Sequence, residues 1–223
     1  IMTSADRIRC IREEIRALSP HPERVRLIAV SKKQNPERML EAARAGILDF
    51  GENRIQEALD KFSRESFPGI TRHFIGYLQS NKVNKCLQNF NWLHSLQTEK
   101  LAGLIAHSEI PLLCLIEVNI SGESSKSGIR PEALRTFVKG LSACPGLQVR
   151  GLMGIAPLTE DENTVRRAFA LLRELALDCR SLETEDLHFD ELSMGMSGDY
   201  RIALQEGATM LRIGTAIFGP RQS

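Results

Sequence analysis

The pattern that most restricts the fold is a regular alternation of short apolar runs with amphipathic segments. Ile8, Ile11, Ile15 and Leu18 recur three or four residues apart and predict a helix over residues 4–18. Eight strand-like runs follow, each separated from the next by a helix-like segment. These runs span residues 26–32, 47–51, 72–78, 92–96, 111–118, 149–155, 189–194 and 210–218.

Alternating strands and helices predict a parallel sheet with right-handed crossovers. Eight such units in 223 residues predict a single-domain (β/α)8 TIM barrel over residues 1–223, with an extra N-terminal helix. We expect no helix after the last strand, and the helix at residues 4–18 would close that gap. A doubly wound open sheet is the alternative that this pattern leaves open.

Composition excludes several classes of function. The net charge of +1 gives no general attraction to nucleic acid or to an anionic membrane. Five cysteines without a C-x-x-C pair predict neither disulfides nor a zinc site, and they fit a reducing cytosol. The histidines have no metal-ligand spacing, so we predict no metal. No apolar run is long enough for a membrane span, and the charged first residues differ from a signal peptide. We therefore expect a cytoplasmic protein that binds neither membrane nor nucleic acid.

Lys32 ends the first predicted strand, directly after the apolar run 27–30. In barrels of this kind the chemistry lies at the carboxyl ends of the strands, which places Lys32 at the mouth. Burial of an ammonium favours the free amine, and a free amine attacks a carbonyl to form a Schiff base. A solvated charge is the ordinary role of a lysine, and we expect that role for the neighbouring Lys33.

Two predicted loops carry groups suited to a phosphate. Ser193 and Ser197 flank a glycine turn after the seventh strand, and Gly214 and Thr215 follow the eighth. Barrels often bind phosphate between these two loops. The alternative role for Ser197 is to cap the next helix, and the first loop alone gives the two roles equal weight; the donors in the second loop favour the phosphate.

Two further polar residues are expected at the mouth. Arg212 either donates a hydrogen bond to a ligand or forms a structural ion pair. Asn53 either caps the helix that starts near Ile55 or contacts a ligand, and the pattern alone favours the cap. An imine-forming lysine facing a phosphate cup indicates pyridoxal 5′-phosphate (PLP), and a phosphosugar aldolase without a cofactor also fits.

Seven motifs in order resemble the pyridoxal phosphate homeostasis protein family. They occupy residues 29–32, 50–57, 73–82, 124–128, 151–153, 192–197 and 212–215, and the resemblance runs from about residue 8 to 219. This family is similar to the N-terminal barrel of alanine racemases and lacks their second, β-rich domain.

The resemblance implies a set of roles for PLP-binding residues. Lys32 would hold the aldehyde as a Schiff base, Arg212 would face the pyridine nitrogen, and Asn53 would lie near the ring or phosphate. Ser193, Ser197, Gly214 and Thr215 would surround the phosphate. Lys126 matches a family lysine linked to a second, surface contact with the cofactor, and a solvated charge is an equal alternative. Tyr77 stands where the family usually has histidine, which puts any role of that histidine in doubt here.

The resemblance favours a carrier over an enzyme. An arginine opposite the pyridine nitrogen disfavours its protonation and weakens the ring as an electron sink. Racemisation needs a second acid/base, which in alanine racemases is a tyrosine from the missing domain. This chain has only Tyr77 and Tyr200. We therefore expect a monomeric, non-catalytic protein of PLP homeostasis that passes PLP to PLP-dependent apo-enzymes. A PLP-dependent racemase of the alanine racemase type is the second hypothesis.

Overall fold

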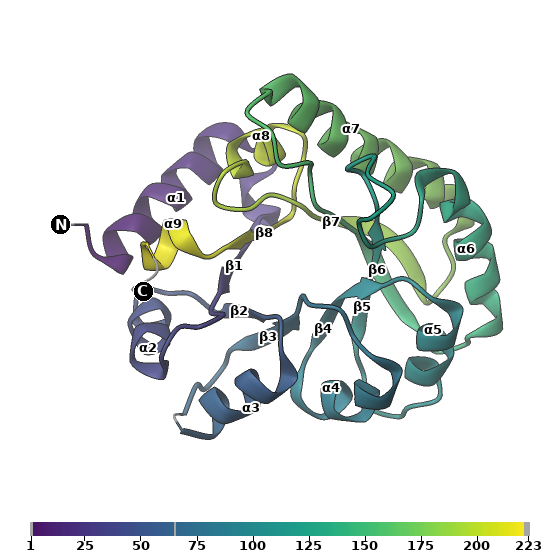
Figure 1. The fold of residues 1–223 in the computed structure, drawn as a ribbon, viewed down its shortest axis with the longest axis horizontal. Helices are drawn as coiled ribbons and strands as arrows, with labels where there is room; N and C mark the ends of the chain where they lie inside the picture. Colours follow the sequence, from purple (N-terminus) through teal and green to yellow (C-terminus); the bar gives the residue numbers. More distant parts are fainter. Residues whose placement is uncertain (1, 65, 221–223) are drawn as a thin grey trace.

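A computed structural model describes residues 2–64 and 66–220, and eight parallel strands close into a barrel there (Figure 1). The strands are β1 Arg26–Val30, β2 Asp49–Glu52, β3 Thr71–Phe74, β4 Trp92–Leu96, β5 Leu113–Val118, β6 Gln148–Gly154, β7 Leu187–Ser193 and β8 Met210–Ile213. Each strand pairs with the next, and β1 also pairs with β8, Leu27 lying opposite Leu211. This closure confirms the TIM barrel and excludes the open sheet.

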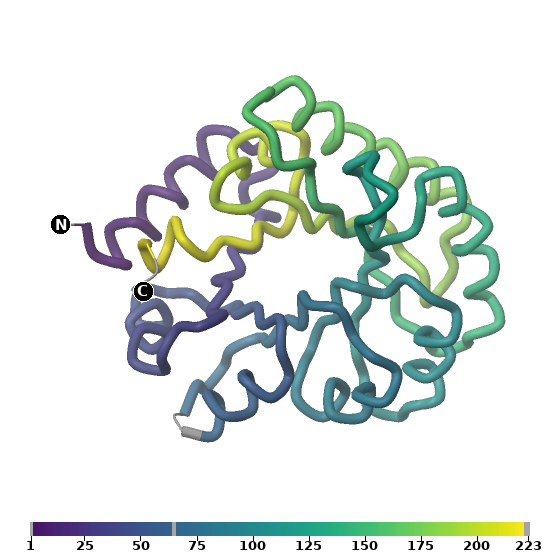
Figure 2. The backbone as a smooth tube through the Cα atoms, viewed as in Figure 1, coloured from purple at the N-terminus to yellow at the C-terminus, as the bar shows by residue number. Residues whose placement is uncertain are grey.

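Helices surround the barrel in chain order, as the colour sequence of Figure 2 shows. They are α1 Ser4–Leu18, α2 Pro36–Arg44, α3 Ile55–Arg64, α4 Val83–Asn89, α5 Glu99–Ala106, α6 Leu134–Gly140, α7 Glu162–Cys179, α8 Tyr200–Gln205 and α9 Thr215–Phe218. Short 3-10 turns are η1 Pro22–Arg24, η2 Ser80–Lys82, η3 Pro131–Ala133, η4 Leu141–Ala143 and η5 Arg180–Leu182.

The extra N-terminal helix is confirmed. Thr3 and Asp6 cap α1 reciprocally, and Ile8, Ile11 and Ile15 are buried on one face. The helix packs against α2, α8 and α9, so it covers the stretch of barrel wall between the first and last units (Figure 1).

The prediction that the last strand reaches Phe218 is wrong. β8 ends at Ile213 and α9 follows it, so a helix does come after the last strand. The amides of Phe218 and Gly219 donate to the carbonyl oxygens of Gly214 and Thr215, which turns the apolar residues 216–218 into one helical turn. An apolar run of this length fits a strand or a buried turn equally well, and periodicity cannot separate them.

Two other strands, β1 and β3, end two or more residues earlier than predicted. β1 stops at Val30; the Ser31 amide still donates to Gly51, and the Gln34 amide then closes a turn onto the Ser31 carbonyl. β3 stops at Phe74 because the chain bends away at Gly76 to pass the loop after β2. In both cases the last residues of the predicted strand form the first part of a mouth loop.

The barrel interior is filled by an apolar layer and one polar path. The layer consists of Ile28, Trp92, Leu115, Met153 and Met210. Beside it lie fully buried histidine and serine side chains from β3, β4 and β7, which lead toward the carboxyl ends of the strands. A larger apolar cluster fills the space between the strands and the helices.

Candidate functional site

A cavity of about 360 Å³ lies at the carboxyl ends of the strands, within the size range of small-molecule sites. Six of the seven residues that the sequence predicts line it: Lys32, Asn53, Ser197, Arg212, Gly214 and Thr215. They come from the ends of β1, β2, β7 and β8, and barrel closure brings them together. The seventh, Ser193, lies beneath the cavity.

Lys32 is held by a buried ion cluster under its loop. The ammonium of Lys61 on α3 donates to the Ser31 carbonyl at 2.5 Å and to Glu52 Oε1 at 2.9 Å. The Ser31 hydroxyl donates to the same carboxylate oxygen at 2.5 Å. These bonds fix the backbone on the N-terminal side of Lys32, so Lys61 positions a lysine that it does not contact. The sequence did not indicate this role, because Lys61 lies in a helical pattern in which a lysine is ordinarily exposed on the surface.

The other side of the Lys32 loop is fixed by Glu57. Its carboxylate accepts the Lys33 amide at 2.5 Å and pairs with Lys61 at 2.7 Å. Lys33 has φ of 60°, a left-handed conformation that L-residues rarely adopt, and its side chain is exposed as expected. Lys32 lines the cavity, whereas Lys33 does not.

Burial and pairing act in opposite directions on the two carboxylates. Burial raises the pKa of Glu52 although Lys61 and Ser31 oppose the shift. Burial also raises the pKa of Glu57, but hydrogen bonds from Lys61 and the Lys33 amide outweigh it and leave that pKa below its ordinary value. The cluster therefore holds the charge on Glu57 more firmly than on Glu52.

Arg212 lies at the cavity floor with only 4% of its surface exposed. Its guanidinium donates to Ser193 Oγ at 2.6 Å and to the Gly154 carbonyl at 3.1 Å. Burial lowers the pKa of Arg212 to about 10, opposed by Asp199 and Glu117, so the group stays charged at neutral pH. Arg212 thus presents a positive charge to the cavity. The oxygens that accept its hydrogen bonds, from Ser193 and Gly154, are neutral.

Ser193 is fully buried, and its hydroxyl contacts His94 Nδ1 at 2.8 Å as well as Arg212. A role against a phosphate, which the sequence predicts for it, stays a prediction. The sequence did not predict that Ser193 lies below Arg212, because a serine at a strand end can either line a cavity or be buried beneath it.

Ser197 does not cap α8. The N-cap position is Asp199, whose carboxylate accepts the Met196 amide at 2.6 Å. The Ser197 hydroxyl instead accepts the Ala216 amide at 3.1 Å, which joins the loops after β7 and β8. These are the two loops in which the sequence places phosphate-binding groups. Gly195, in the loop after β7, has φ of 99°, and a Cβ there would lie 2.7 Å from the Cβ of Ala203.

Asn53 does not cap α3. Its Oδ1 is buried and accepts no hydrogen bond from residues 2–64 and 66–220. The loop is held close to its neighbour, since a Cβ at Gly76 would lie 2.3 Å from the Asn53 carbonyl oxygen. A buried acceptor without a partner is costly, and a ligand donor in the cavity would satisfy it.

Apolar side chains form the remaining walls of the cavity. Val30, Ile75, Ile155 and Met196 line it, and the last two are partly exposed at its rim. An apolar wall above a buried cation suits a flat aromatic ring with polar substituents.

Lys126 lies apart from this cavity, on the exposed loop after β5, and its ammonium is 4.0 Å from the Glu123 carboxylate.

Neither tyrosine lines the cavity. Tyr77 is 69% exposed beside a neighbouring hollow. Tyr200 is buried between α8 and α1 and donates to Glu14 Oε2 at 2.6 Å; burial and this hydrogen bond raise its pKa to about 12. The described residues therefore place no phenol opposite Lys32 in this cavity.

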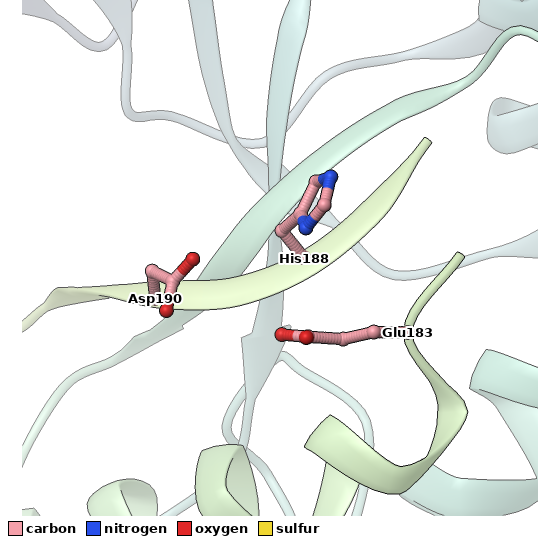
Figure 3. A group of neighbouring side chains, drawn as sticks. All are labelled: Glu183, His188 and Asp190. Carbon is pink, nitrogen blue, oxygen red and sulfur yellow. The ribbon is translucent and has the colours of Figure 1, made fainter. Parts of the chain in front are cut away.

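One group of side chains elsewhere has ligand atoms close enough for a metal ion. Figure 3 shows Glu183 reaching from the loop after η5 toward β7, which carries His188 and Asp190. The three groups already have other partners: the Phe189 amide, the Glu185 carbonyl and the Arg180 guanidinium, respectively. They lie near the start of β7, away from the mouth, and we assign no metal to them.

Comparison with known proteins identifies the class and then the family. The family model "Alanine racemase, N-terminal domain" matches residues 6–222. A pyridoxal phosphate homeostasis protein of Pseudomonas aeruginosa is 43% identical over 215 residues, which cover 95% of this chain and 91% of the relative. A relative of the same name from Vibrio cholerae is 44% identical over 205 residues, covering 88% and 86% of the two chains. The chain belongs to the pyridoxal phosphate homeostasis protein family.

Solved structures agree with this assignment. PipY of Synechococcus elongatus, determined with PLP bound, is 36% identical and superposes with a TM-score of 0.84 over 97% of this chain and all of that one. Its structure without PLP gives 0.86 over 96% and 99%. Alanine racemase of Corynebacterium glutamicum is 15% identical with a TM-score of 0.71 over 96% of this chain and 62% of its own, which shows a shared fold. No helix in the described ranges is both long and apolar enough to cross a membrane.

Proposed function

We propose that this protein binds PLP at the mouth of the barrel, through a Schiff base to Lys32, and serves PLP homeostasis without efficient catalysis. The observation that carries the proposal is the convergence of Lys32, Arg212 and the loops after β7 and β8 on one cavity. The PLP-bound relative of the same fold supports this cofactor. In the proposal residues 1–223 act as one cytoplasmic, monomeric domain, and the five free cysteines fit a reducing compartment.

The residues present fit the cofactor. PLP supplies an aldehyde, and the Lys32 amine bonds to its carbon with loss of one water molecule. Ser197, Gly214 and Thr215 offer hydroxyl and amide donors to the phosphate, with Ser193 below them. Asn53, which lines the same cavity, has a buried acceptor with no partner among the described residues. The apolar side chains of Ile75, Ile155 and Met196 would contact the ring and exclude water.

The same residues favour low catalytic power. Arg212 stays cationic at neutral pH, so a proton on a pyridine nitrogen facing it would put two positive charges together. Racemisation also needs an acid/base on the face opposite Lys32. Tyr77 is exposed outside the cavity and Tyr200 is bound to Glu14, which removes the support for the racemase alternative. We propose that bound PLP is instead released to PLP-dependent apo-enzymes.

An absorbance spectrum of the protein loaded with PLP tests the binding residue. Wild type should show an imine band near the visible edge, and Lys32→Ala should lose it. Lys33→Ala is the matched control, because Lys33 is the exposed neighbour and should keep the band. A band that survives in Lys32→Ala would refute the assignment of Lys32. A colourless wild type that cleaves a phosphosugar would favour the aldolase.

Incubation with amino acids tests the carrier. Loaded protein mixed with D- or L-alanine should give no racemised product above free PLP. Transfer is tested by mixing loaded protein with a PLP-dependent apo-enzyme and following the recovery of that enzyme's activity. Sustained racemase turnover would overturn the non-catalytic role while leaving PLP binding intact.

A further inference from the structure

A continuous hydrogen-bonded chain crosses the barrel interior from its amino end to the cavity floor. Asp49 Oδ1 lies 2.7 Å from His73 Nε2, and His73 Nδ1 lies 2.9 Å from His94 Nε2. His94 Nδ1 lies 2.8 Å from Ser193 Oγ, which accepts from Arg212 at 2.6 Å. The five side chains come from β2, β3, β4, β7 and β8.

The two ends of the chain open on opposite ends of the barrel. Arg212 lines the mouth cavity, whereas Asp49 lines a separate hollow of about 390 Å³ next to α1 and the start of β1. Asp49 also pairs with Arg26 at 3.1 Å. Between the ends, His73, His94 and Ser193 are fully buried, in an interior that barrels usually fill with branched apolar residues.

Burial keeps both histidines neutral. It lowers the pKa of His94 well below the ordinary value, and His73, Arg212 and Arg26 add to the shift. It also lowers the pKa of His73, although Asp49 opposes the effect. A neutral imidazole has one donor nitrogen and one acceptor nitrogen, so each ring must adopt a single tautomer.

Neutral rings leave one consistent arrangement of protons. The Asp49 carboxylate can only accept, so His73 carries its proton on Nε2 and accepts on Nδ1. His94 must then donate from Nε2 and accept on Nδ1. That acceptor takes the Ser193 hydroxyl proton, and the Ser193 oxygen is left to accept from Arg212. Every donor in the chain therefore points toward Asp49.

We propose that Asp49, His73 and His94 are positioning residues, which orient the Ser193 hydroxyl as an acceptor and so fix the Arg212 guanidinium at the cavity floor. The inference rests on the proposed function, in which Arg212 faces the PLP ring. The chain occupies one N–H of Arg212, and Gly154 occupies another. The remaining donors are then held in a fixed orientation before a ligand arrives, which lowers the entropy cost of binding.

Histidine tautomers test the chain without PLP. Nitrogen-15 NMR of the imidazoles in the PLP-free protein should show His73 and His94 neutral at pH 7, each protonated on Nε2. Protonation of His94 on Nδ1, or a cationic ring, would overturn the proposal. This readout is valid even if the protein binds no PLP, so it separates the chain from the proposed function.

Asp49→Leu tests the positioning role, because it removes the oxygen that accepts from His73 Nε2 and so frees both rings to change tautomer. We expect a changed tautomer pattern, a shifted imine band and PLP affinity lower by roughly tenfold, the effect of one hydrogen bond lost between Arg212 and the ligand. Arg26→Gln is the matched control: it removes the ion pair of Asp49 but leaves the chain, so the tautomers, band and affinity should stay as in wild type. Equal losses of affinity in both variants would mean that Asp49 acts only through Arg26.

Ser193→Ala removes the oxygen that accepts from Arg212 and should weaken PLP binding. A direct contact of Ser193 with phosphate predicts the same loss, so the remote Asp49 is decisive. Wild-type band and affinity in a folded Asp49→Leu protein would overturn the positioning role and leave PLP binding standing.

Discussion

The Lys61 ammonium donates a 2.5 Å hydrogen bond to the carbonyl oxygen of Ser31, the residue before Lys32. A side chain on α3 thereby anchors the loop that presents the proposed attachment lysine. The same ammonium neutralises Glu52, whose second carboxylate oxygen has no hydrogen-bond partner among the described residues. The support of the loop thus depends on one buried cation.

Replacing Lys61 with methionine should cost about 3–5 kcal/mol of unfolding free energy, because Glu52 would be left buried without its cation. Urea unfolding followed by circular dichroism measures the change. Lys33→Met is the control, since that side chain is exposed and should alter stability by about 0.5 kcal/mol or less. Adding Glu52→Gln to Lys61→Met should recover part of the loss. A folded Lys61→Met protein with wild-type stability would contradict the buried ion pair.

Replacement by alanine should destabilise the protein at Gly76 and stabilise it at Gly103. A Cβ at Gly76 would lie 2.3 Å from the Asn53 carbonyl oxygen, so Gly76→Ala should lower the unfolding free energy by about 1–3 kcal/mol and weaken PLP binding. A Cβ at Gly103 in α5 would have no described atom within 4 Å apart from its own helix backbone and chain neighbours, so alanine there should add about 0.5–1 kcal/mol to the unfolding free energy. Thermal unfolding of both variants checks the pair, and equal shifts would refute the close approach at Asn53.

Replacement by phenylalanine should lower the stability of the protein at Tyr200 but not at Tyr77, and should leave PLP binding unchanged at both positions. Tyr200→Phe removes a buried hydrogen bond to the Glu14 carboxylate and should cost about 1.5 kcal/mol. Tyr77→Phe removes an exposed hydroxyl and should change stability by less than about 0.5 kcal/mol. Neither variant should change the PLP band, and we expect neither to racemise alanine. A racemase activity that disappears in Tyr77→Phe would restore the enzyme hypothesis.

His94 should make the protein less stable as the pH falls. Its folded-state pKa lies well below 6.5, whereas the unfolded chain binds a proton below about pH 6.5. The unfolded state therefore holds more protons in that window, and the unfolding free energy should fall by up to about 1.4 kcal/mol from this group between pH 7.5 and 5.5.

A comparison of variants isolates that contribution. Burial raises the pKa of Glu52, Glu117 and Asp199, so these groups stabilise the fold at low pH and lose that effect as the pH rises. They are common to all variants and cancel in the difference. His94→Gln should lose less stability on acidification than wild type, while His21→Gln, at an exposed position, should follow wild type. Parallel curves for all three proteins would mean that His94 is not buried neutral.

The sequence alone determined the fold class and most of the cavity lining. The alternation of apolar runs and amphipathic helices is a local property, and it led to eight strand ends where Lys32, Asn53, Arg212, Gly214 and Thr215 were expected. Parallel strands in a closed barrel bring their carboxyl ends together whatever the details of packing. Strand ends were less well predicted, because the short apolar run 216–218 fits a strand or a helical turn.

Only the tertiary structure decided what supports those residues. Lys61 and Ser31 are 30 residues apart, and His94 and Ser193 are 99 apart, so no local pattern links them. Whether a strand residue faces the interior depends on the register, and register shifts occur between β4 and β5, β5 and β6, and β6 and β7. Closure of the barrel sets these registers and places Ser193 under Arg212. The residues that meet a ligand were thus readable from the chain, whereas the buried groups that orient them were decided by how eight strands close on one another.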